Sequence, residues 1–186
     1  MKKLIIGISG ASGVIYGIRL LEILSKKPVE THLIITDTAK AIIRLETNYP
    51  IEEVEALANC LYAVNDMDAP ISSGSFRTEG MIIIPCSIKS LSALANSYNV
   101  NLLIRAGDVT LKEKRNLIVV VRETPLHKGH LELMLKLAGL GATILPPMPS
   151  FYHKPHTVDE IINQTVGKIL DFIGIENELY RRYSPV

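Results

Sequence analysis

Five short apolar runs without polar alternation constrain the fold more than any other feature of this sequence. They are rich in β-branched residues and cover residues 4–8, 32–35, 81–84, 117–121 and 142–145. A strand with one buried face alternates apolar and polar side chains, whereas a strand that is covered on both faces does not. The runs therefore predict a parallel sheet between two layers of helices.

The segments between the runs carry helical spacing. One helical face is formed by Leu131, Met134, Leu135 and Ala138. A later apolar stripe extends from Val158 to Ile169, and Thr157 with Glu160 forms a capping box at its start. We expect this last helix to end near Gly174.

A sixth, shorter strand is expected at residues 60–64. The predicted fold class is therefore α/β, a Rossmann-like three-layer α/β/α arrangement with a mostly parallel six-stranded sheet in the order 3-2-1-4-5-6. With 186 residues, of which 47% are hydrophobic, the chain has material for one core. We expect a single domain over residues 1–186, with residues 175–186 as a C-terminal tail. Ligands of such sheets bind where the strand order reverses, so the loops after Ile8 and Ile84 should flank the site.

Charge and cysteine usage narrow the class of protein. The net charge of +1 disfavours binding to nucleic acid or to an anionic membrane through the surface as a whole. The apolar runs are far shorter than the roughly 20 residues of a membrane helix, which predicts a soluble protein. Cys60 and Cys86 cannot form a disulfide framework and suit a reducing compartment, so the cytoplasm is the expected location.

A glycine-rich turn follows the first expected strand. Residues 7–13 read GISGASG, and they let a ligand approach the backbone at a helix N-terminus, as a phosphate or the edge of a flavin would. The spacing matches neither G-x-G-x-x-G nor a Walker A loop, and simple tight packing is the alternative. Thr36 and Asp37 follow the second strand, where they would contact a ribose or phosphate, or only cap a helix.

The other lip of the expected crevice reads PCSIKS over residues 85–90, with two hydroxyls for a polar ring edge or a phosphate. Cys86 has no evident His and Asn to activate it, so a small buried thiol is favoured over a nucleophile. The pairs His127 with His130 and His153 with His156 lack nearby Cys or carboxylate ligands, and we expect no metal site.

The segment from residue 105 to residue 123 carries a surplus of positive charge. Arg105 and Lys112 are seven residues apart and share a helical face, whereas Lys114 and Arg115 are expected to face solvent. Arg122 and Glu123 directly follow the strand at residues 117–121, at the edge of the sheet where the crevice should lie.

The chain resembles the UbiX-type flavin prenyltransferases, whose flavoprotein scaffold is shared with phosphopantothenoylcysteine decarboxylase. Six ordered stretches carry the resemblance along the chain: GISGASG (7–13), SSGSF (72–76), PCSIKSLS (85–92), RAGDVTLKEKR (105–115), VRETPLHKGHL (121–131) and PPMPSFYHKP (146–155). The resemblance implies a metal-independent enzyme that joins the dimethylallyl group of dimethylallyl monophosphate to N5 and C6 of reduced FMN, which is a co-substrate. The product, prenylated FMN, would serve UbiD-type decarboxylases, with ubiquinone biosynthesis as the setting. A flavin reductase and a homododecamer are also implied.

The same resemblance implies roles for single residues. The expected FMN contacts are Gly10, Ala11, Ser12, Thr36, Ser87, Ile88, Lys89, Ser90 and Arg122. The expected ligands of the prenyl phosphate are Arg105, Lys112, Tyr152 and Lys168, and the candidates for proton handling are Ser12, Glu46 and Glu123. Thr36, Lys168 and Tyr183 stand where many members have Ser, Arg and Trp. Lys168 keeps the charge but lacks the planar fork of arginine.

Three alternatives stay open at this point. An FMN-dependent decarboxylase of the phosphopantothenoylcysteine type usually carries P-x-M-N-x-x-M-W, where this chain reads PCSIKSLS. A non-catalytic flavin-binding regulatory subunit is disfavoured by Arg122, Glu123 and Tyr152. An NAD-binding Rossmann protein is disfavoured by the glycine spacing.

Overall fold

The computed structural model describes residues 2–183. The chain divides into two compact units, Met1–Pro146 and Pro147–Val186. The first unit contains the sheet and most of the helices, and the second contains one long helix and the C-terminal segment. The expectation of one domain with a tail from residue 175 stays a prediction, and residues 184–186 of that tail lie outside the described residues.

The sheet of the first unit has six strands in the order β3-β2-β1-β4-β5-β6, which confirms the predicted order. Every neighbouring pair is parallel. The strands are β1 (Lys2–Ile8), β2 (Val29–Ile35), β3 (Cys60–Tyr62), β4 (Gly80–Cys86), β5 (Asn116–Val121) and β6 (Thr143–Ile144). All residues of β4 are buried, as expected for a strand covered on both faces.

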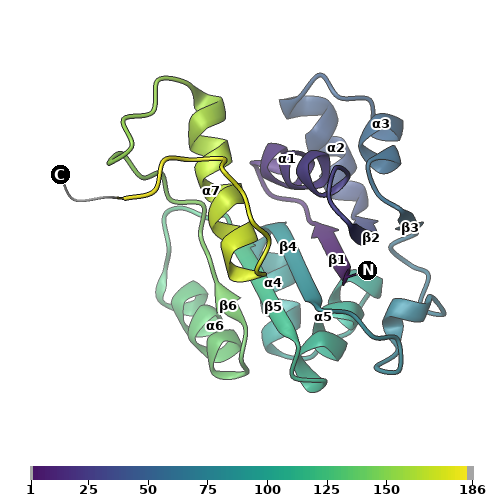
Figure 1. Ribbon diagram of the computed structural model, residues 1–186. Coiled ribbons are helices and arrows are strands. Elements are labelled where there is room, and N and C mark those ends of the chain that lie inside the picture. The colour runs from purple at the N-terminus through teal and green to yellow at the C-terminus, as the bar shows by residue number, and fades with distance from the viewer. Residues whose placement is uncertain (1, 184–186) are drawn as a thin grey trace. The chain divides into compact units, whose positions relative to one another are not determined.

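The helices of the first unit form two groups. One group connects β1 to β3: α1 (Val14–Leu24), α2 (Asp37–Glu46) and α3 (Ile51–Ala56). The other connects β4 to β6: α4 (Ile88–Ala95), α5 (Leu102–Lys112) and α6 (Lys128–Gly139). From β1 to β3 the chain moves toward one edge of the sheet, and from β4 to β6 it moves toward the other edge. Because crossovers between parallel strands are right-handed, the two groups of helices lie on opposite faces of the sheet (Figure 1). The short helix η1 (Pro70–Ser72) lies in the connection from β3 to β4.

The expected apolar face of α6 is largely at the surface. The helix forms where its spacing predicts, but Leu131 and Leu135 are 52% and 74% exposed, and the fully buried apolar residue of this helix is Leu137. The stripe read from the sequence therefore contributes little to the core of a single chain.

Two arginines hold the loop at residues 72–76. Arg105 Nε donates to the Ser72 carbonyl at 3.0 Å. Arg115 donates to the carbonyls of Phe76 and Gly74 at 2.8 and 2.7 Å. The expectation that Arg115 faces solvent is wrong, because these carbonyls, which the sequence pattern does not reveal, take up its guanidinium.

The second unit contains α7 (Val158–Phe172). Thr157 accepts a hydrogen bond from the Glu160 N–H at 3.2 Å, but Glu160 Oε2 accepts from the N–H of His156 rather than from that of Thr157, so the predicted capping box forms in part. The helix is capped by Ile173, and Gly174 follows with a φ of 65°, which confirms the predicted end. Within residues 2–183, no helix is long and apolar enough to cross a membrane.

Ser9 connects β1 and β4 just beyond the end of β1. Its buried hydroxyl donates to the Pro85 carbonyl at 3.0 Å and accepts from the Ser87 N–H at 2.8 Å. The Ser9 N–H also donates to the Pro85 carbonyl, at 3.2 Å. These bonds fix the two loops at which the strand order reverses.

Replacing Ser9 by alanine is expected to lower the free energy of unfolding by about 1–3 kcal/mol, because the Ser87 N–H loses its partner at a buried place. Chemical denaturation followed by circular dichroism measures the change. Ser25→Ala is the control, since the exposed Ser25 hydroxyl bonds only to the Glu22 carbonyl, and its effect should stay within about 0.5 kcal/mol. Equal stability of the two variants would contradict the role given to Ser9.

Candidate functional site

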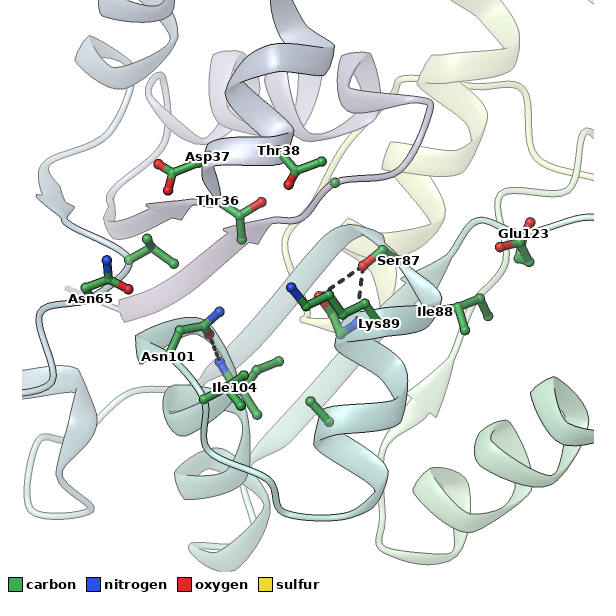
Figure 2. A pocket seen from close by; sticks show the side chains of 15 residues that line it. Thr36, Asp37, Thr38, Asn65, Ser87, Ile88, Lys89, Asn101, Ile104 and Glu123 are labelled. Atoms are coloured by element: carbon green, nitrogen blue, oxygen red, sulfur yellow. Dashed lines mark hydrogen bonds between the residues drawn. The ribbon is translucent and has the colours of Figure 1, made fainter.

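A cavity of about 530 Å³ lies beyond the carboxyl ends of the central strands of the first unit (Figure 2). Its polar lining comes from the ends of β1, β2 and β4 and includes Gly10, Thr36, Ser87 and Ser90. Glu123, after β5, also lines it. The volume falls within the roughly 300–1,000 Å³ that small-molecule sites occupy. The cavity therefore lies at the reversal of strand order, as the fold predicts.

Three helices direct their N-termini at this cavity. Their N-cap side chains accept from backbone N–H groups: Thr36 of α2 from Ala39 at 3.2 Å, Ser87 of α4 from Ser90 at 3.2 Å, and Asn101 of α5 from Ile104 at 3.0 Å. All three N-cap residues line the cavity, and the bonds of Ser87 and Asn101 are drawn in Figure 2. Each helix N-terminus carries a partial positive charge and N–H groups left over by the cap. The arrangement attracts an anion such as a phosphate.

The rest of the lining is mainly apolar. Its apolar residues are Val64, Ile88, Ala93, Val100 and Ile104, and the polar residues Asp37, Thr38, Asn65 and Lys89 complete the lining. The apolar side chains come from the segment after β3 and from the region of α4 and α5. An apolar surface beside converging N–H groups suits a ligand with a flat ring or hydrocarbon part and an anionic end.

The glycine-rich turn approaches the cavity closely at Gly10. A Cβ built on Gly10 would lie 2.5 Å from Thr38 Cγ2, so a side chain here would force Thr38 to move. Gly13 has a φ of 92° and precedes α1, and its N–H donates to Glu46 Oε2 at 2.8 Å. The exposed Glu46 is thereby held against the turn that contains Ala11 and Ser12, two residues that do not themselves line the cavity.

Arg122 and Glu123 follow β5 as predicted. The Arg122 N–H donates to the Cys86 carbonyl at 3.1 Å, which places the residue beside the end of β4, and its side chain is exposed. Glu123 Oε1 accepts from the Thr124 N–H at 3.0 Å. Of the three residues predicted to handle protons, Ser12, Glu46 and Glu123, Glu123 is the one that lines the cavity.

The predicted phosphate ligands on α5 do not reach this cavity within one chain. The helix begins at the cavity with Asn101, and Lys112 is its last residue, about 16 Å away along the axis at about 1.5 Å per residue. Lys112 Nζ lies 2.7 Å from Glu113 Oε1 and holds the pKa of that carboxyl below its usual range. Arg105 contacts Ser72 and, at 3.7 Å, Asp108.

Tyr152 and Lys168 belong to the second unit, where both have aromatic neighbours. The Tyr152 ring lies edge-on to the Tyr183 ring, with the centroids 5.7 Å apart. Lys168 Nζ lies 5.9 Å from the centroid of the Phe172 ring. Both Tyr152 and Lys168 are exposed.

Several lining residues were not among the predicted ones. Asn101 directly precedes the apolar run at residues 102–104, and this N-cap signal is readable from the sequence. Asn65 follows β3, a strand of only three residues, and no pattern identifies it.

Neither histidine pair belongs to a group of possible metal ligands in the part of the chain that is described. The group found there, Glu30, His32 and Cys60, has its ligand atoms within 4.8 Å of one another and involves the first half of β2, away from the cavity. Lys3 Nζ lies 3.3 Å from Glu30, and His32 Nδ1 lies 3.0 Å from the Tyr62 hydroxyl. These side chains thus have partners within the protein.

Comparison with known proteins gives consistent results. The sequence pattern of the Flavoprotein family matches residues 1–175. The flavin prenyltransferase UbiX of Thauera aromatica is 55% identical over 182 residues, which cover 98% of this chain and 94% of that protein.

Two solved structures are similar in fold and sequence. AnUbiX (PadA1), crystallised in complex with FMN and dimethylallyl pyrophosphate, superimposes with a TM-score of 0.98 at 42% identity, covering 100% of this chain and 98% of that chain. A dodecameric FMN-dependent UbiX-like decarboxylase from Escherichia coli O157:H7 gives a TM-score of 0.97 at 48% identity, covering 98% and 100%.

Cys86 lies at the end of β4, next to the cavity-lining residue Ser87. Its side chain is fully buried, and burial raises the pKa of its thiol to about 12. The thiolate is the reactive form of cysteine, so this environment supports the interpretation of a structural thiol.

We expect iodoacetamide at pH 8 to leave Cys86 unmodified in the folded protein, because about one thiol in ten thousand is ionised four pH units below its pKa. After unfolding in urea, the same residue should be modified. Peptide mass mapping measures both states, and rapid modification of Cys86 in the folded protein would contradict the buried-thiol interpretation.

Proposed function

Because the chain belongs to the Flavoprotein family and, within it, to the UbiX-type flavin prenyltransferases, we propose that it transfers a dimethylallyl group from dimethylallyl monophosphate to N5 and C6 of reduced FMN. The protein is a transferase. The observation that carries the proposal is the cavity at the reversal of strand order, where three helix N-termini meet an apolar surface and one carboxylate.

FMN fits the residues of this cavity. Its phosphate and polar ring edge would bind at the helix N-termini and the hydroxyls of Thr36, Ser87 and Ser90, and its ring would lie against the apolar side chains. The absence of a side chain at Gly10 lets the turn lie directly against Thr38, and both residues line the cavity. When bound in its reduced form, FMN supplies the electron-rich N5 and C6 to which the prenyl carbons become bonded.

Basic residues would stabilise the departing phosphate. Breaking the allylic C–O bond leaves negative charge on the phosphate, and fixed donors are most effective where charge develops. Arg122, Lys168 and the Tyr152 hydroxyl are the proposed donors. The two cations, Arg122 and Lys168, would take the place that a metal ion has in other prenyl transfers.

Glu123 is the proposed acceptor of the proton that leaves C6 when the C6–carbon bond closes. That bond breaks the double bond of the prenyl group, whose other carbon takes up a proton, so the step is a net proton transfer from C6 to that carbon. The Glu123 carboxylate lines the cavity and is oriented by the Thr124 N–H. Such proton transfer requires the carboxylate to lie within hydrogen-bond reach of the reacting atom. Glu46 and Ser12 would contribute from the glycine-rich turn, where Glu46 is bonded to Gly13.

Arg105 and Lys112 would act in the site of a neighbouring chain. Lys112 lies at the end of α5 remote from the cavity of its own chain, so a homododecamer with sites shared between chains reconciles its position with a role in phosphate binding. The exposed Leu131 and Leu135 provide apolar surface for such contacts.

The proposed partners follow from the chemistry. A flavin reductase would supply reduced FMN, and a UbiD-type decarboxylase would receive the prenylated product. The cytoplasm stays the predicted compartment, on the basis of the free cysteines Cys60 and Cys86.

Anaerobic incubation of the protein with reduced FMN and dimethylallyl monophosphate is expected to give a flavin heavier by one prenyl unit, detected by mass spectrometry. A parallel arm with dimethylallyl pyrophosphate tests the choice of phosphate. Unchanged flavin in both arms would refute the proposal. Release of CO₂ from an aromatic acid by this chain alone would favour the decarboxylase alternative.

Lys112→Ala and Glu123→Gln are each expected to lose most of the prenyl transfer. If the site is shared, unfolding and refolding the two variants together should restore activity, because some cavities then combine an intact Lys112 with an intact Glu123. Refolding each variant alone is the control. If the two variants assemble together and prenyl transfer still does not recover, Lys112 and Glu123 act in a site formed by the same chain.

A further inference from the structure

The carboxylate of Asp171, in the last turn of α7, is surrounded by donors from the segment that follows the helix. Arg182 donates to both carboxylate oxygens, at 2.9 and 2.8 Å, in a two-pronged pair. The Tyr180 hydroxyl donates at 2.7 Å and Asn177 Nδ2 at 3.0 Å. Bonding to Arg182 is the main reason that the pKa of Asp171 is lowered to about 2. Asp171 is thus a fixed anion.

The bonds to Asp171 hold residues 175–183 against α7. The segment turns at Gly174 and runs back along the helix (Figure 1). A Cβ built on Gly167 would lie 2.5 Å from Tyr180 Cδ1, so the tyrosine ring packs directly on the helix backbone. Asn177 Nδ2 also donates to the Gly167 carbonyl, at 3.3 Å. We call residues 175–183 the return segment.

The last residue of the return segment, Tyr183, contacts Tyr152, one of the proposed phosphate ligands. Tyr183 directly follows Arg182, and its ring stands perpendicular to that of Tyr152, with centroids 5.7 Å apart. Aromatic rings favour an edge-to-face arrangement of this kind. The position of Arg182 therefore restricts where the Tyr152 ring can lie.

The second proposed ligand, Lys168, is three residues before Asp171 on the same helix. Residues with this spacing are neighbours on a helix surface, and a free Asp171 would attract the Lys168 ammonium. Arg182 instead occupies both oxygens of Asp171, and Lys168 has no salt bridge within residues 2–183. The lysine charge thus stays available for an anion.

We propose that Asp171 is a positioning residue for the prenyl phosphate. By binding Arg182 it holds Tyr183 against Tyr152, and the same bond keeps its own charge from pairing with Lys168. The inference rests on the proposed function, which gives Tyr152 and Lys168 to the phosphate. Holding ligands in place before binding lowers the entropy lost when substrate binds.

Asp171→Asn is expected to raise the KM for dimethylallyl monophosphate about three- to tenfold, as for loss of one charge-assisted bond pair, with kcat changed less than about twofold. Arg182→Gln should raise the KM more, because it removes the same bond and also frees the Asp171 carboxylate to pair with Lys168. The double variant should match Asp171→Asn, because no carboxylate then remains to pair with Lys168. Arg182→Lys, which keeps the charge without the fork, should fall between these variants and the wild type.

Glu178→Gln is the matched control, because it removes one exposed carboxylate from the same return segment without touching Asp171. Its KM should equal that of the wild type. The affinity for FMN should be unchanged in all of these variants. Hydrogen exchange of residues 175–183, measured by mass spectrometry, should be faster in Asp171→Asn, Arg182→Gln and the double variant, and unchanged in Glu178→Gln.

Two results would overturn the inference. One is an unchanged KM in variants whose return segment exchanges faster. The other is a parallel loss of FMN affinity and kcat, which indicates a general structural role. Failure of the proposed function is distinct, because the wild type would then give no prenylated flavin with either phosphate, and the positioning role would fail with it.

Discussion

The Ser9 hydroxyl, placed between the Pro85 carbonyl and the Ser87 N–H, holds together the two loops on which the cavity depends. Neighbouring strand ends are joined in the same way by single backbone bonds, from Thr36 to Ile8 and from Arg122 to Cys86. The ends of β2, β1, β4 and β5 therefore keep a fixed spacing beyond the sheet itself. A buried serine can hold this point because its hydroxyl is both donor and acceptor, whereas alanine and valine side chains are neither.

That fixed spacing explains how the cavity attracts an anion with few cations in its lining. Among the residues that line it, Lys89 is the cation, and Asp37 and Glu123 are acids. The N-termini of α2, α4 and α5 supply oriented N–H groups instead. Such dipoles cannot turn away, so they need little reorganisation when a ligand binds. Side-chain cations are flexible and strongly hydrated by comparison.

The sequence predicts the strand order and the end of the sheet at which the cavity lies, because both follow from unalternating apolar runs and from the handedness of crossovers. It also predicts Thr36 and Ser87, which directly follow strands, and the glycine-rich turn that contains Gly10 at this end of the sheet. It fails for Arg115, whose partners are loop carbonyls 39 and 41 residues away. It fails also for the lining residue Asn65, beside a strand too short to show a pattern. Helical spacing alone could not reveal that Leu135 faces outward, because a surface stripe and a core stripe have the same period.

Three basic residues outside the cavity have a carboxylate partner within the same chain. Lys112 is paired with Glu113, and Arg105 lies near Asp108, while Arg182 is bound to Asp171. These three positive charges are thus balanced locally, whereas Lys168 has no such pair within residues 2–183. Exposed pairs of this kind contribute little to stability, so a phosphate dianion can replace a partner such as Glu113 at low cost. Asp171 differs because several donors converge on it, and we therefore expect it to keep its partner while the weaker pairs exchange theirs for substrate.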